Sequence, residues 1–387
     1  MFGIKRRTKF LFSKTCDLIG TLLLHIVQLL PLQAKFVFNT WHGRGFCDEP
    51  KYILLELLKQ NIKAKYIWLV NDLNAEMPPQ VTKVKYGSWL AMFHYTTAKI
   101  WVDNAKASPK PKKRLGQFYL QTWHACWGLK GVEQAVETQL SDWYIEAAKL
   151  DASKTDLMYS NNEYEKQKRE SSFWYDGPVI NAGSPSLSVL FNTPKDIVQK
   201  VHETFDIPLD TKIIIYAPTF RKEFSTEVYL WDYERIIMAL ENKFGGEFTL
   251  LVRLHPNISS KKLGIEYSAK VKDATQYLDM YELLAVSDIL ITDISSTMSF
   301  MAFVKKPVFL FAKDFDEYVA SERSLVYPLE KLPFTISRSV DELEKSIVEF
   351  NQKTYNDKCD TFMKDIGFHD DGKGAEKICR ILARQLR

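Results

Sequence analysis

Residues 212–217 read KIIIYA, a run of β-branched and aromatic side chains that predicts a buried β-strand. Helical patterns follow over residues 232–243, 280–286 and 296–304, and Gly245-Gly246 ends the first of them. Apolar strand patterns over residues 247–254, 288–292 and 307–311 separate these helices. Alternating strands and helices are typical of a parallel sheet with crossover helices. This part of the sequence therefore predicts an α/β domain.

The N-terminal half has the same alternation without repeating the sequence. Strand patterns cover residues 35–41, 64–70, 99–102 and 118–122, and helical patterns cover residues 49–60 and 88–97. The turn-like Gly183-Ser184-Pro185 precedes a domain boundary that we expect within residues 192–208. We therefore expect an α/β fold with domains at 35–195 and 196–387, the last part mostly helical. Ligands in such sheets bind outside the carboxyl ends of the strands, so a cleft between the domains is expected.

Composition excludes several classes of protein. Of 387 residues, 46% are apolar and 26% are charged, as in globular proteins. A net charge of +4, from 52 basic and 48 acidic residues, is too balanced to indicate nucleic-acid binding. The five cysteines form no CxxC pair, which disfavours a disulfide scaffold or a zinc site and suits a reducing cytoplasm.

The N-terminal segment, residues 1–34, suggests a membrane surface. A basic stretch, residues 5–9, precedes an apolar stretch, residues 18–32, which lacks a signal-peptide cleavage site. The apolar stretch is shorter than a spanning helix and is interrupted by His25 and Gln28. A helix lying in an anionic membrane interface fits, and an ordinary buried helix is the alternative. The lysine-rich residues 106–114 are expected to form a mobile loop that also touches lipid.

The motif QTWHACWGLK, residues 121–130, carries a candidate base. A strand delivers His124 to its carboxyl end, where a general base can approach a ligand. Lys130 is placed to reach a phosphate, and Cys126 has no evident base to make it a nucleophile. The alternative is a strand-end histidine that is satisfied by packing.

Three further motifs end strands in the second half. YAPTFR, residues 216–221, presents the Thr219 hydroxyl and the Arg221 guanidinium, which suits phosphate, although a solvated turn is the commoner case. In RLHP, residues 253–256, Arg253 and His255 share one strand face and fit an anionic ligand. In TDISS, residues 292–296, hydroxyls and free N–H groups at a helix start form an anion site or a simple N-cap.

These four motifs, in this order, resemble the CDP-glycerol glycerophosphotransferase family of teichoic-acid type. FNTW at 38–41, DEPKYI at 48–53, KYGS at 85–88 and TAK at 97–99 extend the resemblance over residues 35–315. It implies a GT-B-like fold, in which two Rossmann-like domains face a central cleft. It also implies transfer of a polyol phosphate, glycerol phosphate by default, from a CDP-linked donor to a hydroxyl of a lipid-linked acceptor. CMP would be released at the cytoplasmic face of the membrane, where the protein would be peripheral.

The resemblance also implies roles for individual residues. His124 would take the acceptor proton, and His255 is the second catalytic candidate. Arg253, His255, Ser295 and Ser296 would hold the donor pyrophosphate. The full expected set of substrate-binding residues is Trp123, Ala125, Cys126, Trp127, Lys130, Ser186, Thr219, Phe220, Arg221, Arg253, Leu254, Asp293, Ser295 and Ser296. His42 and Arg44, which also follow a strand, are candidates for acceptor contacts.

The sequence departs from the family pattern at positions that affect the donor. The family's usual Gly-Thr-Pro-Leu-Lys after the histidine is replaced here by residues 125–130. Ser186 stands where the family has an arginine, and Phe300 stands where it has an acid. CDP-ribitol or another donor therefore stays open, as does the choice between a primase and a polymerase.

Two other functions remain alternatives. They are a GT-B nucleotide-sugar glycosyltransferase and a non-catalytic binding module of a polymer-assembly complex. No carboxylate cluster resembles a magnesium site, so we expect chemistry without metal or cofactor, with Asp293 as the alternative metal ligand.

Overall fold

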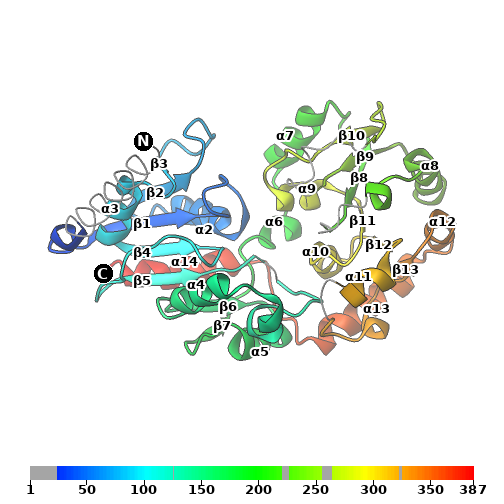
Figure 1. Ribbon diagram of the computed structural model, residues 1–387. Helices are drawn as coiled ribbons and strands as arrows, with labels where there is room; N and C mark the ends of the chain where they lie inside the picture. Colours follow the sequence, from blue (N-terminus) through cyan, green and yellow to red (C-terminus); the bar gives the residue numbers. More distant parts are fainter. Residues whose placement is uncertain (1–23, 125, 220–225, 255–263, 322–324) are drawn as a thin grey trace, which may run out of the picture.

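Two parallel β-sheets form the centres of two domains (Figure 1). The computed structural model describes residues 24–124, 126–219, 226–254, 264–321 and 325–387. The first sheet has the strand order β3-β2-β1-β4-β5 and the second has the order β10-β9-β8-β11-β12-β13. A small pair, β6-β7, continues beside β5 through a bridge between Leu120 and Leu157.

The strands are β1 (Gln33–Asn39), β2 (Lys65–Val70), β3 (Val81–Lys85), β4 (Ala98–Asp103), β5 (Phe118–Gln121), β6 (Met158–Ser160), β7 (Val179–Asn181), β8 (Lys212–Ala217), β9 (Phe248–Val252), β10 (Val271–Asp273), β11 (Ile289–Thr292), β12 (Val308–Phe311) and β13 (Ile336–Ser337). The α-helices are α2 (Asp48–Lys59), α3 (Trp89–Thr97), α4 (Asp142–Ala152), α5 (Glu163–Ser172), α6 (Ser188–Phe191), α7 (Lys195–Phe205), α8 (Tyr233–Phe244), α9 (Met280–Val286), α10 (Thr297–Phe303), α11 (Phe315–Ser321), α12 (Val340–Val348), α13 (Gln352–Asp365) and α14 (Gly374–Gln385). Short 3₁₀ helices are η1 (Glu133–Gln139), η2 (Thr226–Tyr229) and η3 (Leu329–Lys331).

The first sheet is buried on both faces. Successive side chains of its strands point to opposite sides, and helices cover both sides. Phe36 and Phe38 of β1 lie in a core with α2 and α14, whereas Val37 lies in a core with α3. The second sheet is covered in the same way. Ile213 and Ile215 of β8 pack toward α9 and α10, and Ile214 packs toward α8. Near-continuous apolar strands are what a parallel sheet with two covered faces requires.

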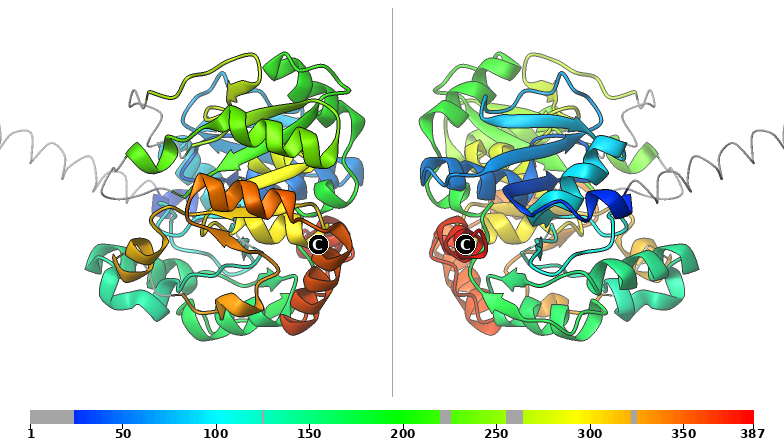
Figure 2. Two further views of the ribbon diagram at one scale, coloured as in Figure 1. Left: turned by 90° about the vertical axis from the view of Figure 1, so that its right-hand side faces the viewer. Right: turned by 90° about the vertical axis from the view of Figure 1, so that its left-hand side faces the viewer.

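The last helix, α14, packs against the first sheet, although its sequence lies within the expected range 196–387. Ile378, Cys379 and Leu382 of α14 are buried in the core beside β1 and α2. The red helix beneath β4 in Figure 1 is this segment, and Figure 2 views the second domain on the left and the first domain on the right. These apolar side chains find their partners on the first sheet, and the first domain is therefore built from both ends of the chain.

The loop over residues 106–114 is held by buried ion pairs, which corrects the expectation of a mobile lysine-rich loop. The Nζ atom of Lys110 lies 2.8 Å from Asp103 and 2.7 Å from Asp151, and its side chain is 1% exposed. The Nζ atom of Lys106 lies 3.2 Å from Glu133, and its side chain is equally buried. Of the lysines at 106, 110, 112 and 113, only Lys112 is strongly exposed.

Candidate functional site

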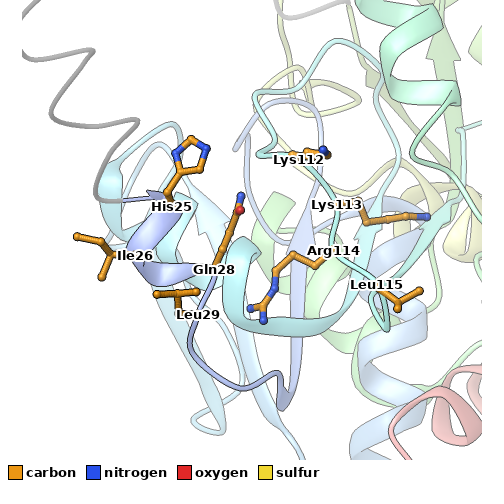
Figure 3. A pocket seen from close by; sticks show the side chains of 8 residues that line it. All are labelled: His25, Ile26, Gln28, Leu29, Lys112, Lys113, Arg114 and Leu115. Atoms are coloured by element: carbon orange, nitrogen blue, oxygen red, sulfur yellow. The ribbon is translucent and has the colours of Figure 1, made fainter.

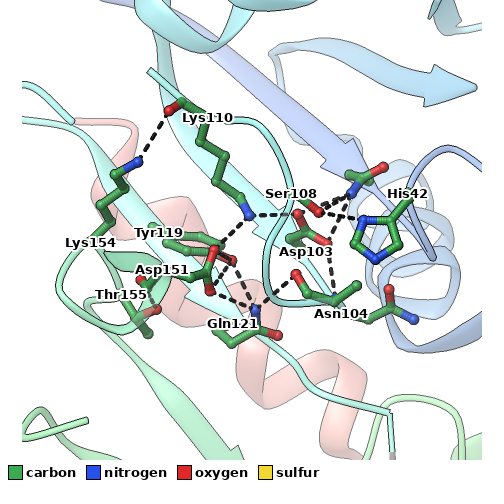
Figure 4. A network of polar contacts seen from close by, with 12 residues as sticks. His42, Asp103, Asn104, Ser108, Lys110, Tyr119, Gln121, Asp151, Lys154 and Thr155 are labelled. Atoms are coloured by element: carbon green, nitrogen blue, oxygen red, sulfur yellow. Dashed lines mark hydrogen bonds and ion pairs between the residues drawn. The ribbon is translucent and has the colours of Figure 1, made fainter. Parts of the chain in front are cut away.

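Three neighbouring strands of the first sheet end on one buried polar network (Figure 4). Asn39 ends β1 and its Nδ2 donates to both carboxylate oxygens of Asp103, at 3.1 and 3.0 Å. Gln121 ends β5 and donates to Asp151 at 3.1 Å, while Lys110 bridges Asp103 and Asp151. Burial alone would lower the pKa of Lys110, but the two carboxylates outweigh it and raise that pKa. The network fixes the strand ends from which the candidate site projects.

His124 follows β5 and is held between two indole rings. Its ring centroid lies 4.4 Å from that of Trp41 and 4.1 Å from that of Trp123. Its Nδ1 faces the main-chain oxygen of Asn104 at 3.3 Å. Since a carbonyl oxygen can only accept, this contact requires the proton on Nδ1, and the lone pair of the neutral ring then lies on Nε2. The carbonyl oxygen of His124 lies 3.5 Å from the Tyr281 hydroxyl of α9, so the histidine sits where the domains meet.

The residues after His124 pack inward. The Cys126 thiol is buried, and burial raises its pKa far above the ordinary value, which disfavours the nucleophilic thiolate. Trp127 is fully buried, and its ring lies against Tyr327 and Phe362. Lys130 lies over the ring of Tyr318 at 4.9 Å. These side chains anchor the loop, and Ala125 lies outside the described residues.

The Ser186 side chain is hydrogen-bonded to a buried glutamate, Glu49. The Glu49 carboxylate accepts from the hydroxyls of Ser186 at 2.6 Å, Ser184 at 2.5 Å and Tyr159 at 2.9 Å. Burial raises the pKa of Glu49 in spite of these bonds. The serine that replaces the family arginine thus joins two segments of the first domain, and Phe300 packs against Tyr281 in the core.

In the second domain, the ends of β8 and β11 are joined by Asp293. Both of its carboxylate oxygens accept from the Thr219 N–H, at 2.9 and 3.0 Å, and Oδ1 also accepts from the Thr219 hydroxyl. Ser295 accepts from the Thr297 hydroxyl at 2.9 Å, and Ser296 precedes α10. Thr219, Ser295 and Ser296 are half-buried. The structure brings these groups together at one edge of the second sheet.

Arg253 follows β9 and lies within the electrostatic influence of Arg44 from the other domain. Its Nη2 donates to the Tyr277 carbonyl at 3.2 Å, and its buried Nε has no partner among the described residues. Burial, and then the positive charge of Arg44, lower its pKa to about 10. An anion between these guanidinium groups would relieve their repulsion. Leu254 is buried and contributes its N–H to Thr275, whereas His255, Phe220 and Arg221 lie outside the described residues.

His42 and Arg44 lie on an exposed turn after β1. The Nδ1 of His42 lies 3.2 Å from the Tyr86 hydroxyl. It also lies 3.2 Å from the Ser108 hydroxyl (Figure 4). Gly43 has a φ of +82°, and a side chain there would meet Tyr86 at 2.5 Å. The turn therefore needs glycine for packing, while the flanking side chains of His42 and Arg44 remain accessible.

Sequence reasoning missed a buried ion cluster that joins the domains. Lys51 of α2 lies 2.5 Å from Asp279 and 2.5 Å from Glu282, and all three side chains are buried. Tyr52 donates to Asp279 at 3.1 Å, and Lys200 lies 2.8 Å from Glu282. Although burial opposes ionisation, Lys51 and Lys200 lower the pKa of Glu282 to about 2. The available signal was a lysine beside the apolar Tyr52-Ile53-Leu54 run, on a helix face that the sequence predicts to be buried.

A cavity of about 670 Å³ lies where the segment 25–29 meets the loop 112–115 (Figure 3). Arg114 ties these parts together through the carbonyl oxygens of Leu30, at 2.9 Å, and Thr96, at 3.0 Å. Leu29 and Leu115 are 84% and 102% exposed. The lining residues are His25, Ile26, Gln28, Leu29, Lys112, Lys113, Arg114 and Leu115.

The described residues hold neither an evident metal cluster nor a membrane-spanning helix. They contain no group of three or more His, Cys, Asp or Glu side chains placed to hold a metal ion. Within the same ranges, we find no helix with the length and apolarity needed to cross a bilayer.

Comparison with known proteins agrees with this architecture. The sequence model of the family described as CDP-glycerol:poly(glycerophosphate) glycerophosphotransferase matches residues 23–384. A solved structure of the wall teichoic acid polymerase TagF is 28% identical, with a TM-score of 0.81, and the match covers 97% of each chain. This likeness confirms the expected GT-B-like arrangement of two Rossmann-like domains.

Curated relatives differ in length. A teichoic acid poly(glycerol phosphate) polymerase of Staphylococcus epidermidis is 28% identical over 370 residues, which cover 91% of this chain and 50% of the relative. A teichoic acid glycerol-phosphate transferase of Staphylococcus aureus is 26% identical, with 92% of this chain and 95% of the relative covered. The chain thus spans about half of the first protein and nearly all of the second.

Proposed function

Since this chain belongs to the CDP-glycerol:poly(glycerophosphate) glycerophosphotransferase family, we propose that it transfers glycerol phosphate from CDP-glycerol to an acceptor hydroxyl. The observation that carries the proposal is the position of His124, whose Nδ1 faces a carbonyl oxygen at the junction of the domains. His124 accepts the hydroxyl proton on Nε2 while the acceptor oxygen bonds to the phosphorus that carries glycerol. The bond from this phosphorus to the bridging oxygen breaks, and CMP leaves with the electron pair.

The donor pyrophosphate fits between the strand ends of the two sheets. Arg253 supplies a buried guanidinium, and Arg44 approaches it from the first domain. Ser295, Ser296 and Thr219 add polar groups on the second domain, together with His255 and Arg221 from the expected set. Phosphoryl transfer depends mainly on positioning and charge stabilisation, so this cluster of cations and hydroxyls suits the reaction.

A donor test separates this function from a nucleotide-sugar glycosyltransferase. We expect CDP-glycerol to raise the melting temperature and to be converted to CMP when a polyol-phosphate acceptor is supplied, with CDP-ribitol as the second donor. UDP- and GDP-sugars should leave the melting temperature unchanged. Stabilisation and turnover with a UDP- or GDP-sugar, but with neither CDP compound, would overturn the proposal.

The proposed acceptor is lipid-linked, and the surface around the cavity between the segment 25–29 and the loop 112–115 suits the cytoplasmic face of an anionic membrane. Exposed Leu29 and Leu115 can enter the interface while Lys112 and Arg114 stay near lipid phosphates.

Cys47, Cys126, Cys359 and Cys379 are free thiols, which suits a reducing compartment.

Membrane docking predicts a specific loss of vesicle binding. In a flotation assay with phosphatidylglycerol vesicles, Leu29→Asp/Leu115→Asp should bind several-fold less than the unmodified protein, because each aspartate removes apolar burial and adds repulsion. Leu209, which is 69% exposed in the second domain, provides the matched control Leu209→Asp. Equal binding by both variants at low salt would contradict the proposed surface.

A further inference from the structure

We propose that Asn104 is a positioning residue that fixes both the tautomer and the orientation of His124. The inference rests on the proposed role of His124 as the base. Asn104 directly follows β4, the strand next to β5, and is completely buried. It therefore approaches the histidine from a neighbouring strand end and not from the loop that carries His124.

Asn104 makes two contacts that act on the same imidazole. Its main-chain oxygen faces His124 Nδ1 at 3.3 Å. Its side-chain Oδ1 accepts a hydrogen bond from the main-chain N–H of Trp41 at 2.9 Å. The Trp41 ring in turn lies against the imidazole, and its Nε1 donates to Asp48 at 2.8 Å. One residue thus contacts the edge of the imidazole and holds the backbone of Trp41, whose ring lies beside the imidazole.

The backbone on both sides of the imidazole is unusual. Trp41 has a φ of +45° and Trp123 a φ of +57°, in the left-handed region that residues with side chains rarely adopt. Such conformations persist where surrounding contacts hold them, and they gather at functional sites. The Asn104 side chain supplies one of these contacts through the Trp41 N–H, and Gln121 supplies the other by accepting the Trp123 N–H at 2.9 Å.

The Nδ2 atom of the Asn104 side chain indicates that this residue does more than stabilise the fold. Its Nδ2 is buried and has no hydrogen-bond partner among the described residues. The amide orientation follows from the Trp41 N–H, which requires the oxygen on that side. A buried donor without a partner disfavours the folded state, so an asparagine here is better explained by what its side-chain oxygen holds.

The test reads the His124 tautomer directly from imidazole ¹⁵N shifts, with His124→Ala to assign its signal among the seven histidines. We expect the proton on Nδ1 in the unmodified protein. Asn104→Ala keeps the main-chain oxygen that faces His124 but removes the acceptor of the Trp41 main-chain N–H. We expect the Trp41 ring and the imidazole beside it to shift away from that oxygen, which gives a mixture of tautomers and a fall in kcat of up to about 100-fold, with KM for CDP-glycerol little changed. Asn104→Asp keeps an acceptor for Trp41 and should keep the Nδ1 proton.

Asn161 provides the matched control, because it is also buried and its Nδ2 also lacks a partner among the described residues. Asn161→Ala should lose thermal stability as Asn104→Ala does, without changing the His124 tautomer. An Nε2 proton on His124 in the unmodified protein would overturn the inference, as would an unchanged tautomer in Asn104→Ala. Absence of CMP release from both CDP donors would defeat the proposed function instead, and the tautomer measurement would still decide the role of Asn104.

Discussion

Replacing His124 with alanine should lower kcat for CMP release by about 10²- to 10⁴-fold, the usual contribution of a general base. The acceptor hydroxyl would then have no group to take its proton as its oxygen bonds to phosphorus. Binding of CDP-glycerol should persist, because the donor contacts proposed for Arg253 and Arg44 lie on other segments. Two measurements separate these effects: single-turnover CMP release reports the chemical step, and a thermal-shift titration with CDP-glycerol reports donor binding.

His94 supplies the control for this experiment. It is a half-buried histidine on α3 whose Nδ1 lies 3.3 Å from Lys35, and burial followed by Lys35 lowers its pKa to about 4. His94→Ala should therefore retain turnover, since His94 stays neutral near pH 7 and lies on a helix away from the strand ends. Turnover by His124→Ala at the rate of the unmodified protein would remove His124 from the mechanism.

Replacing Lys51 with methionine should destabilise the protein by about 3–5 kcal/mol, because Asp279 and Glu282 would remain as buried charges without their shared cation. The loss should be largest near neutral pH. A carboxyl group with a lowered pKa stabilises the fold above its unfolded pKa, and for Glu282 this contribution disappears as the pH falls from about 4.5 toward 2. The two proteins should therefore converge in stability at acid pH.

Urea unfolding at several pH values measures this difference. Lys353→Met is the matched control, because Lys353 pairs with Asp357 at 3.0 Å while its side chain is 87% exposed. Exposed pairs of this kind contribute little to stability. If Lys51→Met is no less stable than Lys353→Met at pH 7, the buried cluster does not hold the domains together.

The sequence predicted the elements whose local pattern matches their environment. KIIIYA became β8 at Lys212–Ala217 and the helix expected over 280–286 became α9 at Met280–Val286, because continuous apolar runs and amphipathic spacing are local signals. The strand β3, which reads VTKVK, was missed because it lies at the sheet edge and carries polar side chains. Its identity depends on pairing with β2, which no local pattern specifies.

The candidate site also contains features that the sequence predicted and features that it did not. The strand ends that carry His124, Thr219 and Arg253 followed from the alternation of strands and helices. The burial of Trp127 and of Ser186 did not, because both are enclosed by segments far away in the sequence. The burial of Lys106 and Lys110 was not predicted for the same reason, since the carboxylates that hold them lie on other elements.

Because α14 packs on the first sheet, the core of the first domain is completed only at the end of synthesis. A ribosome releases β1 and α2 early, yet the apolar surface beside them is covered only when Ile378 and Leu382 emerge more than 300 residues later. The strands and helices of the second domain are by then complete. The half of the protein that is made first is therefore the half that can finish folding last, and its exposed core needs protection during translation.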